Sequence, residues 1–312
     1  MSKEKNTKDL KKSKFDKIFN LIIVIVVCAA VVFGLVMAVI NAVGGSKDGK
    51  SSDTADTSTT IEKIDFSKGL TEEGFIEGID DETQYVELAF SPKEGIHISA
   101  DEVVPTDAEI ESEIEELLSG RSEEGLEFND DFVKTYLESD LTAEEYRQKI
   151  KDDLQLERVT EYINSYVADA YTTLDVPDVY VDVYADYLKY IDQVNLQYMN
   201  ALYSQLAGTI AYSDVYDMKG CTEEDYDSVI AQEADIAVVE MIAYQLMFKE
   251  LDLVITVGDF EEYLVDNDIL LTYEDYGMPY INSLIIRKMV NEKLIENAVI
   301  DYPEEDYFEE EE

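Results

Sequence analysis

The sequence predicts a mainly α-helical protein with an N-terminal transmembrane helix, a small β element and an extended multi-helix domain that contains two long antiparallel helices. Three observations support this fold class. Residues 21–43 form one uncharged, apolar run. Polar and apolar residues alternate between Gln84 and Phe90, which is typical of a half-buried strand. After Pro105, apolar residues recur at the three- and four-residue spacing of amphipathic helices.

The apolar run Leu21–Val43 is long enough, at ~1.5 Å per residue, to cross a ~30 Å hydrocarbon core. Seven lysines precede it. Because positive charge is retained on the cytoplasmic side, we expect residues 1–20 in the cytoplasm and the rest of the chain outside the cell membrane, behind an uncleaved signal anchor. A cleaved signal peptide is the alternative. Its apolar region usually spans ~7–15 residues, shorter than this run, although Ala42-Val43-Gly44 would suit cleavage.

Two further features fit an extracytoplasmic position. Residues 44–60 are small and polar, as in a flexible stalk. Cys221 has no cysteine partner outside the apolar run, so the sequence contains no disulfide framework. Cys28 could mark a lipoprotein, but the bulky Val27 before it and the apolar residues after it favour a thiol buried in lipid.

The composition excludes several classes of function. The chain holds 24 Lys and Arg against 71 Asp and Glu, a net charge of −47. Residues 1–50 carry nine lysines and four acids, a net of +5, so the remainder carries −52. A nucleic-acid partner is not expected, because phosphate backbones need clustered cations. The single histidine, His97, excludes paired-histidine zinc motifs, and neither a Gly-rich phosphate loop nor a Gly-x-Ser-x-Gly elbow is present. We therefore predict no catalytic residue, no metal and no cofactor.

Residues 61–100 predict a small β-containing segment. The alternating stretch Gln84–Phe90 is followed by turn residues at 91–95, and the alternation resumes at Ile96-His97-Ile98. His97 lies between two isoleucines, so its side chain is expected on the opposite, exposed face of the strand.

Residues 101–300 predict a helical domain whose helices begin at capping residues. In each case a threonine is followed three positions later by an acid, which is the pattern of a capping box. The pairs are Thr106 with Glu109, Thr142 with Glu145, Thr222 with Asp225, and Thr256 with Asp259. The first helix is expected to stop at Ser119-Gly120, the second to run from Thr142 through Leu174, and the last from Pro279 through Val299.

The helix expected from Pro177 to about Ala211 is apolar over much of its circumference. One stripe carries Tyr180, Tyr184 and Tyr187, and a second face carries Leu188, Met199 and Tyr203. Such a helix is either buried on two sides or offers one side to a partner. Tyrosine gives large amphipathic contacts at little entropic cost, and methionine repacks easily. The candidate peptide-binding residues are Tyr187, Tyr190, Tyr198, Met199 and Tyr203. The alternative is that they pack against neighbouring helices.

The chain from about Gln84 to Ile300 resembles bacterial trigger factor, a family of chaperones. Gln84–Leu88 with Gly95-Ile96 is similar to the end of that family's N-terminal domain, and Val103–Ile110 resembles the linker helix before its prolyl-isomerase domain. Five further segments are similar to the chain that follows the isomerase: Glu127–Val133, Leu141–Tyr146, Val176-Pro177, Val257–Tyr263 and Leu284–Val290. The order and spacing of these segments carry the resemblance.

The departures from this family bear directly on function. Only a few residues separate Leu118 from Glu127, where a domain on the order of a hundred residues would be needed for the isomerase. The Gly-Phe-Arg ribosome-docking signature is missing, and a segment of net −52 would be repelled by ribosomal RNA. The resemblance therefore implies a helical peptide-holding module, of the kind that the SurA chaperone also uses, without ribosome binding or isomerase activity.

The sequence thus predicts a non-enzymatic, membrane-anchored chaperone that holds unfolded or newly exported polypeptides outside the cytoplasm without ATP. The alternative is an accessory or scaffold subunit that binds one fixed protein partner at the cell envelope. The sequence does not identify the clients or the oligomeric state. It also leaves open whether the helical domain is an open cradle or a closed bundle. Residues 301–312 end in four glutamates and predict a disordered acidic tail, with weak attraction of calcium as the alternative.

Overall fold

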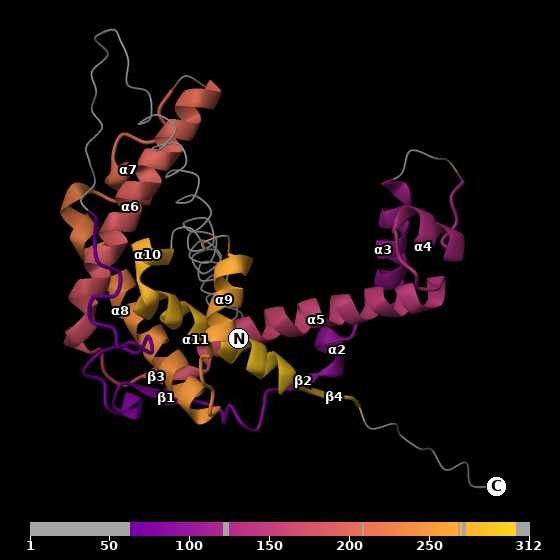
Figure 1. Cartoon of the computed structure of the whole chain (residues 1–312), viewed down its shortest axis with the longest axis horizontal. Helices are drawn as coiled ribbons and strands as arrows, with labels where there is room; N and C mark the ends of the chain where they lie inside the picture. Colours follow the sequence, from indigo (N-terminus) through magenta and orange to yellow (C-terminus); the bar gives the residue numbers. More distant parts are fainter. Residues whose placement is uncertain (1–62, 121–124, 208, 268, 270–272, 304–312) are drawn as a thin grey trace, which may run out of the picture. The chain divides into compact units, whose positions relative to one another are not determined.

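The computed structural model describes residues 63–120, 125–207, 209–267, 269 and 273–303 (Figure 1). The chain divides into two compact units, each assembled from separate stretches of sequence. We call them unit 1 and unit 2. Within the described residues, unit 1 comprises 63–85, 174–245 and 254–287, and unit 2 comprises 86–173, 246–253 and 288–303.

Unit 1 is built mainly from helices, as the sequence predicts. Its elements are η1 (Glu82–Gln84), α6 (Asp178–Ala207), α7 (Val215–Lys219), α8 (Glu223–Glu250, up to Gln245), α9 (Val257–Asp266), α10 (Tyr273–Tyr276) and α11 (Met278–Glu296, up to Arg287). Contacts between α6 and α8 pair Asp192 with Tyr226 and Lys189 with Asp227. Burial raises the pKa of Tyr184, earlier on α6, and the charge of Glu240, later on α8, contributes to that rise. Because positions earlier on α6 lie near positions later on α8, the two helices run in opposite directions.

Unit 2 combines helices with two small sheets. Its elements are β1 (Val86–Leu88), β2 (His97–Ser99), α2 (Ala100–Val103), α3 (Asp107–Ser119), α4 (Asp130–Tyr136), α5 (Ala143–Asp169), β3 (Tyr171–Thr173) and β4 (Val299–Asp301). Strands β1 and β3 pair antiparallel, and β2 and β4 pair in parallel. Figure 1 shows α3 and α4 lying against one end of α5. Their shared core contains Ile110, Ile114 and Ile150, with Phe128 and Tyr146 packed against it.

The predicted β element is present, and its strands pair with distant parts of the chain. Val86 lies opposite Thr173, and His97 lies opposite Val299. The expected exposure of His97 is confirmed: its Nδ1 lies 3.1 Å from a carboxylate oxygen of Asp301, while the adjacent Ile98 is fully buried. This hydrogen bond links β2 to β4.

Two helices end earlier than the sequence predicted. Helix α5 stops at Asp169 instead of reaching Leu174, and α11 stops at Glu296 instead of Val299. In both places the chain enters a strand. Tyr171–Thr173 consists of an aromatic and two β-branched residues, which favour strands, and pairing with β1 supplies their backbone hydrogen bonds. Asp301 belongs to β4 and not to the predicted tail, and residues 304–312 lie outside the described chain.

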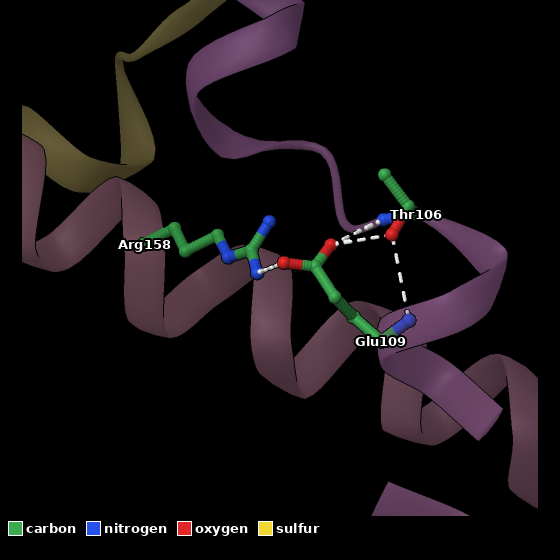
Figure 2. A network of polar contacts seen from close by, with 3 residues as sticks. All are labelled: Thr106, Glu109 and Arg158. Atoms are coloured by element: carbon green, nitrogen blue, oxygen red, sulfur yellow. Dashed lines mark hydrogen bonds and ion pairs between the residues drawn. The ribbon is translucent and has the colours of Figure 1, made fainter. Parts of the chain in front are cut away.

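Capping boxes form at Thr106, Thr142 and Thr256, and at Thr222 the hydroxyl accepts from the Asp225 backbone N–H at 3.2 Å. Figure 2 shows the one that starts α3: the Glu109 carboxylate accepts from the Thr106 backbone N–H at 2.7 Å and from its hydroxyl at 2.8 Å. Arg158 of α5 donates to the other Glu109 oxygen at 2.6 Å. These hydrogen bonds, the one from Arg158 foremost, lower the pKa of Glu109 to about 2. The same residues therefore begin α3 and tie it to α5.

The predicted transmembrane anchor at 21–43 and the stalk at 44–60 lie outside the described residues. Among the helices that are described, none combines the length and the apolar character needed to span a bilayer.

Candidate functional site

An aromatic cluster in unit 1 is centred on Phe66. Its ring lies 5.2 Å from the ring of Tyr187, 5.5 Å from Tyr190, and 5.4 Å from each of Tyr276 and Tyr280. The contacts are edge-on or tilted, which are the geometries that aromatic rings prefer. We call these five residues the Phe66 cluster. It joins the segment before η1 to helices α6, α10 and α11.

Local structure on both sides positions this cluster. On α6, Tyr180, Tyr184 and Tyr187 follow one another at four- and three-residue spacing, so they share a face of the helix. Opposite them, Gly69 adopts a φ of 76°, and a Cβ there would lie 2.9 Å from the Tyr180 ring. The Ser67 hydroxyl donates to the Tyr276 carbonyl at 3.2 Å. The segment around Phe66 is therefore held against the tyrosines by close contacts that a larger residue at position 69 would disturb.

Two tyrosine hydroxyls of the cluster hydrogen-bond to each other. The hydroxyls of Tyr187 and Tyr280 lie 2.6 Å apart. Burial raises the pKa of both phenols well above the usual value, and it raises the pKa of Tyr184 to about 12. All three groups are thus neutral phenols at physiological pH and act through hydrogen bonds and ring surfaces.

A cavity of about 210 Å³ opens beside the cluster. Its aromatic wall is formed by Phe66, Tyr180, Tyr184, Tyr187 and Tyr280. Asp65, Lys68 and Asp186 supply its charged groups. We call this cavity the tyrosine pocket. It combines ring surfaces with a few polar groups, which is the composition of a pocket that binds a small group or a single side chain.

A second polar group lies within unit 1, where α6, α7 and α8 meet. Asp192 of α6 is only 5% exposed and accepts a hydrogen bond of 2.9 Å from the Tyr226 hydroxyl. Lys219 of α7 lies 3.4 Å from Asp192 and 2.7 Å from Glu233 of α8. Burial raises the pKa of Asp192 even though Lys219 and Tyr226 oppose that shift. This group fixes α7 between the two long helices and has a structural role.

The five predicted peptide-binding residues do not share one environment. Tyr190 is 8% exposed and Tyr187 is half-buried, and both belong to the Phe66 cluster. Tyr198 and Met199 are half-buried. Tyr203 is 44% exposed. The alternative of packing thus holds for Tyr190, and the part of the predicted surface that is open to solvent lies toward the C-terminal end of α6.

Unit 1 also exposes more large apolar side chains than unit 2. Among the described residues nine such side chains lie in unit 1 and four in unit 2. Those of unit 1 are Leu174, Val179, Tyr203, Ile210, Ile236, Val254, Val257, Val265 and Met278. They are spread over several helices and the connections between them. Unit 1 therefore has dispersed apolar contact points in addition to its aromatic core.

Among the described residues, no three or more His, Cys, Asp or Glu side chains group so that they could hold a metal ion. Cys221 is half-buried and has a free thiol.

No protein-family model, curated protein or solved structure matches this chain. The resemblance to trigger factor therefore stays a prediction from the sequence.

One wall of the tyrosine pocket is predictable from the sequence and the other is not. Helical spacing predicts the stripe of Tyr180, Tyr184 and Tyr187. Phe66 is not predictable, because a single aromatic residue in a turn-rich segment carries no periodic signal. Tyr276 and Tyr280 lie four residues apart, which could have marked a second aromatic face. An acid at position 192, within an apolar helix, was the available signal for the buried polar group.

Proposed function

We propose that this chain is a membrane-anchored, extracytoplasmic chaperone that holds unfolded or newly exported polypeptides without ATP. The observation that carries the proposal is the set of dispersed, exposed apolar side chains of unit 1 in a chain of net charge −47. A holding protein needs apolar contacts for varied clients and enough charge to stay soluble while it offers them. Both properties occur together here.

The dispersal of the apolar side chains favours changing clients. A fixed interface buries one continuous patch, whereas the exposed residues of unit 1 lie on α6, α8, α9, the start of α11 and the loops between helices. Ile210, shortly after the end of α6, and Val257 and Val265, on α9, are among the most exposed of these residues. An unfolded chain could contact several such points at once, and each weak contact would add to the total affinity.

The proposed location depends on the apolar run Leu21–Val43, which would hold the chain in the membrane with residues 1–20 in the cytoplasm. In this position the chaperone would meet polypeptides as they leave the membrane. The short connection between Leu118 and Phe128 is the reason that we propose holding without prolyl isomerisation.

A second candidate function is that of a scaffold subunit with one folded partner. The observation in its favour is the order of the Phe66 cluster: Tyr187 and Tyr190, two of the predicted contact residues, are fixed by ring contacts. A preformed aromatic surface suits a partner of constant shape. The range of clients separates the two functions, since a scaffold would bind one protein and a chaperone several unrelated ones.

An aggregation assay tests the proposal. The full-length chain in lipid nanodiscs is mixed, without ATP, with three unrelated proteins diluted from denaturant, and light scattering is followed. We expect reduced aggregation of all three. The double variant Tyr203→Ser/Ile210→Ser should lose much of this effect. The matched control is Leu141→Ser/Leu156→Ser, which removes two exposed apolar side chains of unit 2 and should change little. Equal loss in both variants, or no suppression by the unaltered chain, would refute the proposed role of unit 1.

A further inference from the structure

We infer that the tyrosine pocket binds the cationic side chain of an arginine or lysine in a client polypeptide. This inference deepens the proposed holding function and rests on it, since it names a chemical feature of the clients. The geometry points to it through three properties of one cavity: aromatic walls, carboxylates beside them, and a volume of about 210 Å³.

The aromatic walls attract cations. Tyr180, Tyr184, Tyr187 and Tyr280 line the cavity together with Phe66. The face of a phenol ring carries negative electrostatic potential, and a guanidinium or ammonium group within about 6 Å of it is stabilised. The phenol oxygens are hydrogen-bond acceptors for the same groups. Arginine is well suited to such a pocket, because its planar head group stacks on rings while it donates in its own plane.

The charges of the pocket also favour a cationic ligand. Asp65 and Asp186 lie in its lining, and Lys68 is the opposing charge there, so the lining has an excess of one negative charge. Lys68 is exposed as a residue, and its flexible ammonium can turn toward water when a ligand enters. The surrounding chain, at net −47, adds a long-range attraction for cationic segments.

The same lining disfavours the other ligand classes. An anion would face Asp65 and Asp186 with only Lys68 in its favour. A purely apolar side chain would contact the rings, Ile64 and Val183, but it would form no ion pair or hydrogen bond with either carboxylate and would cover polar phenol groups. A cationic side chain with an apolar stem satisfies both parts of the pocket.

The test compares two peptides that differ by charge alone. Gly-Ser peptides bearing one arginine or one citrulline, its neutral analogue of the same shape, are titrated to millimolar concentration into the full-length chain in nanodiscs. Binding is followed by relaxation of the peptide NMR signals. Salt is kept at about 0.15 M, where charges more than ~8 Å apart are largely screened. We expect the arginine peptide to bind at least about fivefold more tightly, as one charge pair beside aromatic rings predicts.

Four variants locate the effect. Asp186→Asn should remove most of the preference for arginine, whereas Asp182→Asn, an exposed acid of α6 outside the pocket lining, should preserve it. Lys68→Ala should tighten binding of the arginine peptide about twofold or more by removing a like charge. Tyr184→Leu should weaken it while the preserved helix signal in circular dichroism shows that the chain is folded.

Several results would overturn the inference: equal binding of the two peptides, equal effects of Asp186→Asn and Asp182→Asn, or weaker binding of arginine after Lys68→Ala. Failure here is distinguishable from failure of the proposed function. If aggregation is suppressed but the arginine preference is independent of the pocket, only this inference falls. If the preference depends on the pocket but no client is kept soluble, the proposed holding function falls.

Discussion

Helices α5 and α6 have similar lengths, 27 and 30 residues, but use their surfaces differently. In α5 one stripe is buried, represented by Ile150, Val159 and Ile163. Two of its arginines form ion pairs with glutamates of α3: Arg147 with Glu111, and Arg158 with Glu109. In α6 aromatic and aliphatic residues occupy more than one face.

The difference shows how a helix can serve as structure or as a contact surface. The buried stripe of α5 packs against α2, α3 and α4, and Leu156 is its exposed large apolar side chain. On α6, Tyr180 and Tyr190 are buried, whereas Val179 and Tyr203 are exposed. Exposed apolar residues of this kind are not needed for the core and are available to contact a ligand. The predictions below test this contrast.

The largest expected effect comes from removing the centre of the Phe66 cluster. Phe66→Ala should lower the free energy of unfolding by about 3–5 kcal/mol, because the ring is buried and contacts four tyrosines. Urea unfolding followed by tyrosine circular dichroism measures it. The control is Phe90→Ala in unit 2, where a half-buried ring contacts Tyr166 and the loss should be smaller. Equal losses would mean that the cluster is not the core of unit 1.

A smaller loss is expected at the buried carboxylate of α6. Asp192→Ala should cost about 2–4 kcal/mol, since it leaves the Tyr226 hydroxyl and Lys219 with fewer partners. Asp192→Asn should cost less, because it keeps an acceptor and removes a charge whose burial raises its pKa. Asp182→Ala, an exposed acid on the same helix, is the matched control. If Asp192→Asn proved as harmful as Asp192→Ala, the negative charge itself would be required.

Glu109 of unit 2 and Asp192 of unit 1 should contribute to stability with opposite dependence on pH. The folded-state pKa of Glu109 is depressed, so its contribution is present above about pH 4.5 and is lost as the pH falls toward about 2. The pKa of Asp192 is raised, so the folded state takes up that proton more readily and gains stability as the pH falls from its folded pKa toward about 3.9.

Glu109→Gln tests this contrast. We expect the variant to be less stable than the unaltered chain at pH 7 and to approach it near pH 2, as measured by urea unfolding at both pH values. Glu113→Gln, an exposed acid of the same helix, should change little at either pH. If Glu109→Gln lowered the free energy of unfolding equally at both pH values, the ionic role of the capping box shown in Figure 2 would be contradicted.

The smallest effect on stability is expected at the exposed end of α6. Tyr203→Ser should shift the free energy of unfolding by no more than about 0.5 kcal/mol, as is usual for surface positions. Tyr190→Ser, on the same helix, should be strongly destabilising because that ring is buried against Phe66. Comparable losses at the two positions would place Tyr203 in the core and remove it from the contact surface.

These residues also show how far the sequence could predict the molecule. The helix starts at Thr106, Thr142 and Thr256 were predictable because a capping box is made by residues three positions apart. The early end of α5 was not, since the three-residue strand Tyr171–Thr173 is too short for a periodic signal and depends on pairing with Val86–Leu88.

The candidate site likewise was predictable only where it depends on residues that are close in sequence. Helical spacing identified the tyrosine face of α6, which is a local property. The opposite wall at Phe66 is more than a hundred residues away in the sequence, and only the folded chain brings it to that face. For the same reason, spacing alone could not separate the buried Tyr190 from the exposed Tyr203.

The most direct test of the account is to trap a bound client and find where it lies. A photo-reactive amino acid is introduced singly at Tyr203, Ile210 or Val257 in unit 1 and at Leu141 or Leu156 in unit 2, all exposed positions. The full-length chain is then illuminated with an unfolded client. We predict cross-links from the three positions of unit 1 and few from unit 2. Equal cross-linking from both units, or cross-linking from unit 2 alone, would contradict the claim that unit 1 is the surface that holds clients.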